Sequence, residues 1–173
     1  RRGLDRARAV ATAHPTVGFT LTTGERTGLR LPAQPLGADG HLVRLGRIMG
    51  REFLDDALLI DAEREGLGLS GFAGLPTLHR PDHGQQYLFV NGRPVKDRGL
   101  SKALGEAYRA LGHFDPKPVA VLFVDLGFDM VDVNVHPAKT EVRFREPARV
   151  FQTVVRAVRK ALSKGTDEKS ARV

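Results

Sequence analysis

The sequence contains no cysteine and no tryptophan, and aromatic residues make up only 6% of its 173 residues. The absence of cysteine excludes disulfide bonds, thiolate metal ligands and cysteine nucleophiles, which fits a protein of the reducing cytoplasm. No apolar run approaches the roughly 20 residues that a membrane-spanning helix needs. Arg1 and Arg2 are not followed by an apolar segment, so we predict no signal peptide.

Basic residues exceed acidic ones, with 27 Lys and Arg against 20 Asp and Glu, a net charge of +7 and a pI near 10.2. Such an excess favours polyanionic partners through contacts with phosphates. Part of it lies at the ends: residues 1–10 hold four arginines against Asp5, and residues 141–173 hold nine basic residues against four acidic ones. Terminal charge of this kind is often only a solvated tail.

The order of elements predicts an α+β domain of ordinary globular composition. Residues 1–13 read as a helix that ends before Pro15, and residues 17–23 alternate as a strand does. The pattern predicts further helices at 42–49, 100–111 and 147–162, and strands at 58–62, 67–73, 86–90, 119–126 and 131–136. We expect the strand at 119–126 to be central, with 131–136 as its neighbour, and a sandwich whose sheet is covered by helices on one face.

A stretch rich in proline and glycine at 32–40 predicts a linker, and we place the domain boundary near it. The prediction is a first segment at 1–36, a folded domain at 37–163 and a disordered basic tail at 164–173. Because the chain does not begin with Met and opens within a helix, we expect it to be a piece of a longer protein. We also expect the apolar faces of the first segment to be poorly covered, or the segment to be mobile.

No self-contained active site is evident in the sequence. Gly66, Gly68 and Gly71 match the dinucleotide-binding pattern, but Pro76 follows too closely for the helix that the pattern needs. Of the six histidines only His79 and His83 stand four positions apart, and the prolines and glycine between and around them argue against a helix, so we predict no bound metal.

Four basic residues follow the Asn91–Gly92 turn: Arg93, Lys96, Arg98 and Lys102. On a strand that runs into the start of a helix, they are close enough to form one patch that contacts DNA phosphates without reading sequence. The alternative is an ordinary charged loop. Arg143 and Arg145 are weaker candidates, since Glu141 and Glu146 are near enough to pair with them.

The stretch Val131-Asp-Val-Asn-Val-His-Pro-Ala-Lys139 alternates apolar and polar residues until Pro137 stops the strand, and alternation resumes at Val142. Lys139 is therefore predicted on a turn between two strands, where its ammonium group is placed to reach a phosphate outside its own domain. The alternative is a solvated turn lysine.

This stretch, with Glu141-Val-Arg-Phe144 after it, resembles a signature of the MutL family of DNA mismatch repair proteins. Tyr87-Leu-Phe-Val-Asn-Gly-Arg93-Pro-Val resembles the family's other strong motif in this region, and the similarity runs from about Ala9 to about Leu162. The resemblance implies the ribosomal protein S5 domain 2-like fold of ATPase transducer domains. It also implies that residues 1–36 are the end of a preceding GHKL-type ATPase domain and a linker.

The resemblance further implies a role in DNA mismatch repair, with ATP state coupled to DNA binding. Lys139 would contact the γ-phosphate of ATP, while ATP and Mg2+ are bound mainly by the preceding domain. Arg98 would be the leading DNA contact of the basic group. We therefore expect this chain alone to hold no cofactor and to show no ATPase activity.

The partners that the resemblance implies are double- or single-stranded DNA without sequence preference, a MutS-like mismatch-recognition protein and downstream repair factors. The whole protein would be a homodimer in the bacterial cytoplasm, associated with the nucleoid and not with a membrane. Three alternatives stay open: an S5-like RNA-binding module, the transducer domain of a type II topoisomerase, and a purely structural spacer.

Overall fold

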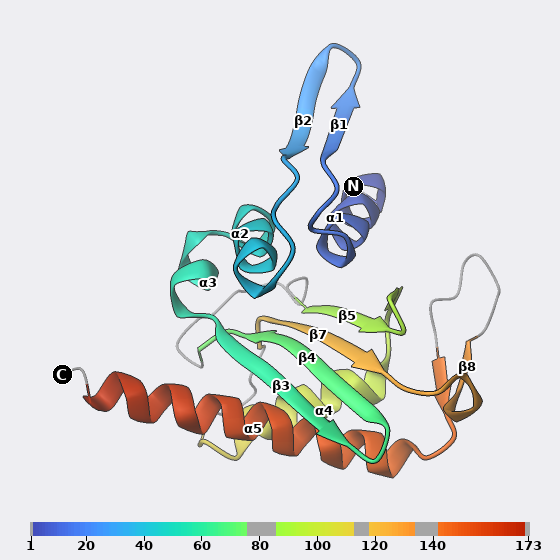
Figure 1. Ribbon diagram of the computed structural model, residues 1–173, viewed down its shortest axis with the longest axis vertical. Helices are drawn as coiled ribbons and strands as arrows, with labels where there is room; N and C mark the ends of the chain where they lie inside the picture. Colours follow the sequence, from blue (N-terminus) through green and yellow to red (C-terminus); the bar gives the residue numbers. More distant parts are fainter. Residues whose placement is uncertain (1, 76–85, 113–117, 134–141, 172–173) are drawn as a thin grey trace. The chain divides into compact units, whose positions relative to one another are not determined.

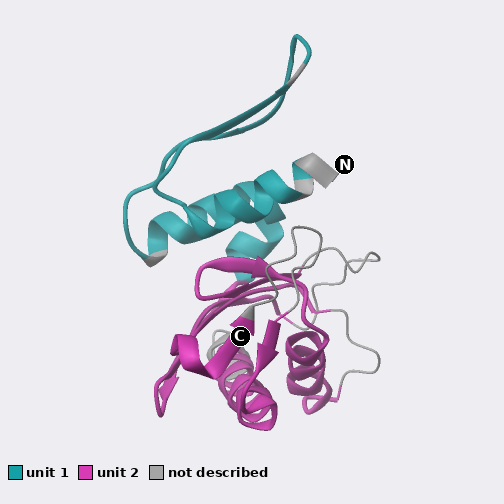
Figure 2. Ribbon diagram, turned by 90° about the vertical axis from the view of Figure 1, so that its right-hand side faces the viewer, with its two compact units in different colours: residues 1–56 teal, residues 57–173 magenta. Residues whose placement is uncertain are grey.

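The computed structural model describes residues 2–75, 86–112, 118–133 and 142–171 (Figure 1). The chain forms two compact units, unit 1 at residues 1–56 and unit 2 at residues 57–173 (Figure 2). No helix in these described ranges is long and apolar enough to cross a membrane.

Unit 1 is a helical unit with a β-hairpin. Its elements are α1 (Arg2–Ala13), β1 (Phe19–Thr23), β2 (Arg26–Leu31), α2 (Ala38–Met49) and α3 (Arg51–Asp56). The buried side chains of its small core include Leu31, Leu45 and Phe53. Large apolar side chains are also exposed here, at Val10, Val17 and Leu36 of the segment for which poor coverage was predicted, and at Val43 beyond it.

The two units divide after Asp56 rather than near residue 36, where the composition placed the boundary. The reason is the packing of α2, whose Arg44 is fully buried. The Arg44 guanidinium donates hydrogen bonds to the carbonyls of Ala11 and Pro32, at 3.0 and 2.8 Å. The helix after the linker is thereby joined to the elements that precede it.

Unit 2 is built on a five-stranded sheet in the order β3-β4-β7-β5-β6 (Figure 1). The strands are β3 (Leu58–Arg64), β4 (Leu67–Ala73), β5 (Gln86–Val90), β6 (Arg93–Val95) and β7 (Ala120–Asp125). Only the β5–β7 pair is parallel. The apolar strand β7 is central, as its composition predicted, because a strand buried on both faces needs no alternation.

Two helices, α4 (Arg98–Arg109) and α5 (Pro147–Ala171), lie on one face of this sheet (Figure 1). Leu104 of α4, Val154 and Val158 of α5, and Leu122 of β7 are completely buried in their shared core. On the other face of the sheet the ring of Phe89 stacks on that of Phe123, with centroids 4.7 Å apart. The predicted α+β sandwich with helices on one face is confirmed.

Two predictions about the C-terminal part are wrong. Strand β8 (Val131–Val133) pairs with β9 (Val142–Phe144) in a separate two-stranded sheet, since both edges of β7 are occupied by β4 and β5. The 3-10 turn η1 (Phe128–Met130) lies between β7 and β8. The expected disordered tail at 164–173 is helical as far as Ala171, because no proline interrupts α5 after its start.

Candidate nucleic-acid interface

The β5–β6 turn is anchored to the end of the central strand. Asn91 and Gly92 have positive φ values of 49° and 80°, as a type I′ hairpin turn requires and as the Asn-Gly pair predicted. The backbone N–H of Asn91 donates to the Val124 carbonyl at 2.9 Å, and its side-chain oxygen accepts from the Leu126 N–H at 2.9 Å. The turn is therefore fixed by its side chain as well as by strand pairing.

Helix α4 begins two residues after β6 and is capped by Asp97. The Asp97 carboxylate accepts a hydrogen bond from the Leu100 N–H at 2.9 Å, which satisfies one of the unpaired amides of the first turn. Arg98 is the first residue of the helix, and Lys102 follows four positions later on the same side. The cap thus defines where the helix begins, with both cations in its first two turns.

The basic patch consists of Arg93, Lys96, Arg98 and Lys102. All four side chains are exposed, and none forms an ion pair within the described parts of the chain. The acidic residue among them, Asp97, is engaged in capping α4. The structure brings the four predicted residues together on one strand–helix unit, with their charges available to an external anion.

A groove of about 420 Å³ lies beside this patch. It is lined by the first residues of α4 and α5 and by β9, with Leu100, Phe144 and Phe151 supplying apolar surface and Arg143 a charge. Glu146 was expected to pair with Arg143 or Arg145, but it binds Arg149 instead, at 3.0 Å. Arg145 is exposed.

Lys139 lies outside the described residues, as does Glu141. The strands on either side of this segment are described, and they pair in antiparallel register with Val133 opposite Val142. The flanking part of the prediction, a strand before and a strand after, is confirmed.

The glycines and histidines considered as candidate site residues have structural roles where the structure describes them. Gly66 lies in the β3–β4 turn and Gly71 lies within β4, so these glycines do not open a helix as a dinucleotide site requires. Among the described residues, no group of three or more His, Asp or Glu is placed to hold a metal ion.

A ring nitrogen of His41 lies 3.0 Å from the Thr12 carbonyl. Burial, and secondarily the charge of Arg44, lowers the pKa of His41, while the Thr12 carbonyl opposes that shift.

Sequence reasoning missed the buried Arg44. Its guanidinium also lies 5.6 Å from the centre of the Phe19 ring. A signal was present, because positions 41, 44, 45 and 48 share one face of a helix, on which Leu45 and Ile48 are apolar. The helical periodicity indicated that Arg44 is buried, but arginine side chains are normally exposed, and the residue type therefore favoured the wrong prediction.

Comparison with solved structures identifies the fold of this chain. A solved structure described as the N-terminal domain of a DNA repair protein superposes with a TM-score of 0.69 at 17% identity, covering 94% of this chain and 53% of that one. The ATPase domain of an Aquifex aeolicus MutL variant gives a TM-score of 0.55 at 22% identity, covering 92% and 50%. The architecture shared with these structures is the S5 domain 2-like α+β fold.

The sequence then identifies the family. The family model for the C-terminal domain of DNA mismatch repair proteins matches residues 45–163. The DNA mismatch repair protein MutL of Phenylobacterium zucineum is 56% identical over 153 residues, and that of Rhodospirillum rubrum is 50% identical over 161 residues. These matches cover 88% and 92% of this chain but only 25% and 26% of the relatives, so the chain spans about a quarter of their length. The chain belongs to the MutL family of DNA mismatch repair proteins.

Proposed function

We propose that this chain is the transducer part of a MutL-type ATPase, which couples the ATP state of the whole protein to DNA contact during mismatch repair. The observation that carries the proposal is the basic patch: four exposed cations without ion-pair partners in the described chain, on a capped and anchored strand–helix unit. Guanidinium and ammonium groups on such a support bind the phosphates of DNA without reading its sequence.

The role of Lys139 in this proposal is to contact the γ-phosphate of ATP held mainly by another part of the protein, together with Mg2+. A cation at that position offsets the charge of the phosphoryl group and responds to its loss on hydrolysis. The pairing of β8 with β9 supports this role, because it gives the segment that carries Lys139 two fixed ends.

The wider context is part of the same proposal. The whole protein would act as a homodimer on double- or single-stranded DNA in the bacterial cytoplasm, at the nucleoid. A MutS-like mismatch-recognition protein and downstream repair factors would be its partners. Family membership supports this context, since the relatives that match are DNA mismatch repair proteins.

The patch is tested by binding of the chain to a duplex of mixed sequence across a salt series. We expect Arg98→Glu to weaken binding and to lower the slope of log K against log salt by about 0.9 or more. Arg109→Glu is the matched control, since Arg109 lies on the same helix and is also exposed but pairs with Glu106 at 2.8 Å. Equal effects of the two substitutions would show that only net charge matters and would refute the patch.

The Lys139 role is tested separately in the whole protein. Lys139→Ala should lower ATP turnover strongly and leave the DNA affinity of this chain unchanged. For the chain alone we expect no turnover. ATP hydrolysis that persists through purification and disappears in the Lys139→Ala variant would contradict that expectation.

A further inference from the structure

Helix α5 carries an unusual charge distribution for a surface helix. Between Pro147 and Thr166 it contains no acidic residue, but it contains Arg149 and four further cations. Arg149 is engaged, because it binds Glu65 at 2.6 Å and Glu146 at 3.0 Å. The four further cations, which we call the α5 stripe, are Arg156, Arg159, Lys160 and Lys164.

The α5 stripe lies on one face of the helix. Its members are separated by three, one and four positions, and residues three and four apart are neighbours on a helix surface. From Arg156 to Lys164 the helix rises by about 12 Å. All four side chains are exposed, and none has an ion-pair partner among the residues whose side chains the structure describes, which on this helix extend to Gly165.

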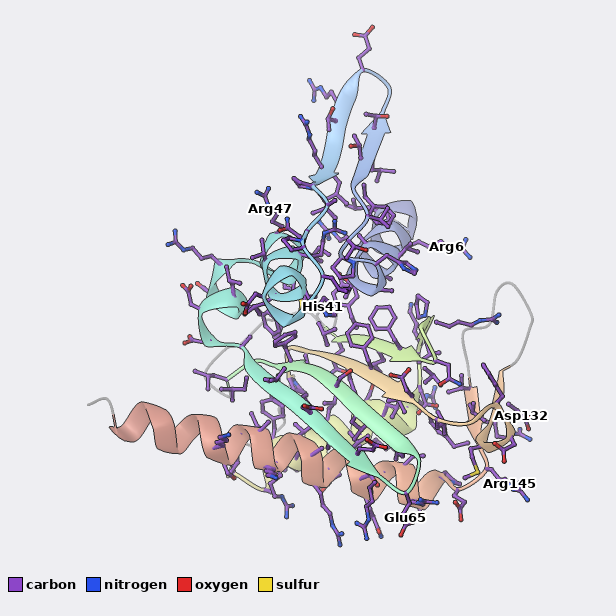
Figure 3. The ribbon with its side chains drawn as sticks, viewed as in Figure 1. Arg6, His41, Arg47, Glu65, Asp132 and Arg145 are labelled. Carbon is purple, nitrogen blue, oxygen red and sulfur yellow. The ribbon has the colours of Figure 1, made fainter. Side chains whose placement is uncertain are left out.

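The opposite face of α5 fixes the direction of the stripe. Val154, Val158 and Leu162 are completely buried in the core that the helix shares with the sheet and α4. Side chains tipped with nitrogen project from the side of α5 that faces away from the sheet (Figure 3). The stripe is therefore held outward by a packed helix, and it is not the solvated tail that the terminal charge suggested.

Folding alone does not account for this arrangement. Two pairs of like charges, Arg156 with Lys160 and Lys160 with Lys164, stand four positions apart, a spacing at which like charges destabilise a helix. A glutamate at one of these positions would turn a repulsive pair into an attractive one. Between Pro147 and Thr166 no acidic residue alternates with these cations, and the first acidic residues after the stripe are Asp167 and Glu168, three and four positions beyond Lys164. A row of cations on one face of a helix matches a ligand with a row of negative charges.

We propose that the α5 stripe is a second phosphate-contact surface for the DNA backbone, separate from the basic patch. The inference rests on the proposed DNA-binding function and extends it to another face of unit 2. The stripe begins about 13 Å along α5 from Pro147, at which end the first turns of α4 and α5 line the groove. An acidic membrane surface is a poorer match, because the apolar face of α5 is in the core and is not available for insertion.

The experiment compares three variants of the chain with the unaltered protein. The stripe variant replaces Arg156, Arg159, Lys160 and Lys164 with Gln, which removes charge and keeps high helix propensity. The charge control replaces four exposed arginines of unit 1, namely Arg26, Arg30, Arg47 and Arg51, with Gln. The patch variant replaces Arg93, Lys96 and Arg98 with Glu. Circular dichroism melting establishes that each variant is folded.

The readout is fluorescence anisotropy with a labelled 30-base-pair duplex between about 50 and 300 mM salt. Each phosphate contact that is lost should lower the salt slope by about 0.9, so the stripe variant should lose about 2 to 3.5 in slope. The charge control should lose clearly less. Vesicles containing phosphatidylserine are titrated in parallel.

The outcomes separate the two proposals. If the stripe variant behaves like the charge control while the patch variant loses binding, the stripe inference is overturned and the proposed function stands. If the patch variant binds like the unaltered chain while the stripe variant loses slope, the stripe is supported and the patch is overturned. A stripe variant that changes only vesicle binding, or an unaltered chain that does not bind the duplex, overturns the stripe as a DNA contact.

Discussion

The buried Arg44 gives the most specific prediction about stability. Its guanidinium donates to four backbone carbonyls, those of Ala11 at 3.0 Å, His14 at 3.2 Å, Val17 at 2.5 Å and Pro32 at 2.8 Å. No carboxylate is among these partners, and the side chain is completely buried. One cation thus joins the end of α1, the start of the hairpin and the chain after β2 to α2. Replacement by Met keeps most of the volume but removes all four donors.

The expected loss of stability is the contribution of the four hydrogen bonds less the cost of burying the guanidinium. Hydrogen bonds to a charged group contribute about 1.5–3 kcal/mol each, so four of them sum to well above 5 kcal/mol in gross terms. The cost of burying the guanidinium offsets part of that sum, and burial accordingly lowers the pKa of Arg44. Three of the four bonds are only partly buried, so water can replace some donors. We therefore expect Arg44→Met to destabilise unit 1 by about 3–5 kcal/mol.

The assay must resolve the two units, because one global transition is not expected for a chain of this kind. Hydrogen exchange read by mass spectrometry reports on unit 1 through the amides of α1, β1, β2 and α2. Both tyrosines, Tyr87 and Tyr108, lie in unit 2, so near-ultraviolet circular dichroism follows the unfolding of that unit. The expected result is faster exchange throughout unit 1, with the tyrosine signal retained.

Arg47→Met is the control, since Arg47 is an exposed arginine on the same helix. Surface arginines away from such networks contribute little, so its effect should stay within about 0.5 kcal/mol. If Arg44→Met costs no more than Arg47→Met, the four hydrogen bonds do not stabilise unit 1 and the reasoning fails.

Three other changes have defined outcomes. Because folding lowers the pKa of His41, the neutral side chain stabilises unit 1 above the ordinary histidine pKa of 6.5, and this stabilisation is lost as pH falls towards the pKa in the folded state. Between pH 7 and 5, the His41→Gln variant should therefore lose less exchange protection in unit 1 than the unaltered chain. An identical pH profile for the two proteins would contradict this. Gly71→Ala should lower the free energy of urea unfolding by at least about 3 kcal/mol, because φ of Gly71 is +135° and a Cβ atom there would overlap the Val121 carbonyl. The control is Gly68→Ala in the same strand, which should lower it by about 1 kcal/mol or less, because no atom lies within 3.8 Å of the added Cβ. Tyr108→Phe leaves the buried Gly74 carbonyl without the donor that the Tyr108 hydroxyl supplies, so it should lower stability by about 1–2 kcal/mol and Tm by several degrees; an unchanged Tm would show that this hydrogen bond contributes nothing.

The sequence predicted those elements whose pattern is set by local chemistry. The Asn91–Gly92 turn was predictable because few residues tolerate its positive φ values. The two helices on the sheet were predictable because each repeats apolar residues with the helical period. The basic patch could be gathered from sequence for the same reason, since its four residues lie on one short turn–strand–helix unit.

The predictions that failed concern contacts between residues that are far apart in the sequence. Alternation showed that Val131–Val133 is a strand, but alternation carries no information about which strand it pairs with. Proline and glycine marked the linker, yet the unit boundary is set by the burial of Arg44, which composition does not reveal. The α5 stripe was visible as charge, and only the packed helix shows that the charge is held on one face.

Described hydrogen bonds connect the turn before the basic patch to the strands that flank the Lys139 segment. The Asn91 side chain, in the turn before the basic patch, accepts from the N–H of Leu126. Immediately after Leu126 the chain enters η1, where the Met130 N–H donates to the Gly127 carbonyl at 2.9 Å and the Met130 carbonyl accepts from the Arg145 N–H at 2.9 Å. Strand β8 follows this turn directly and pairs with β9, and the two strands flank the Lys139 segment.

One hydrogen-bonded turn therefore lies between the anchor of the patch and the strands that flank Lys139. Coupling between two sites requires an element that both of them bias, and mere proximity does not supply it. The turn from Leu126 to Val131 is a candidate for that element, because it is bonded to the Asn91 turn on one side and continues into β8 on the other.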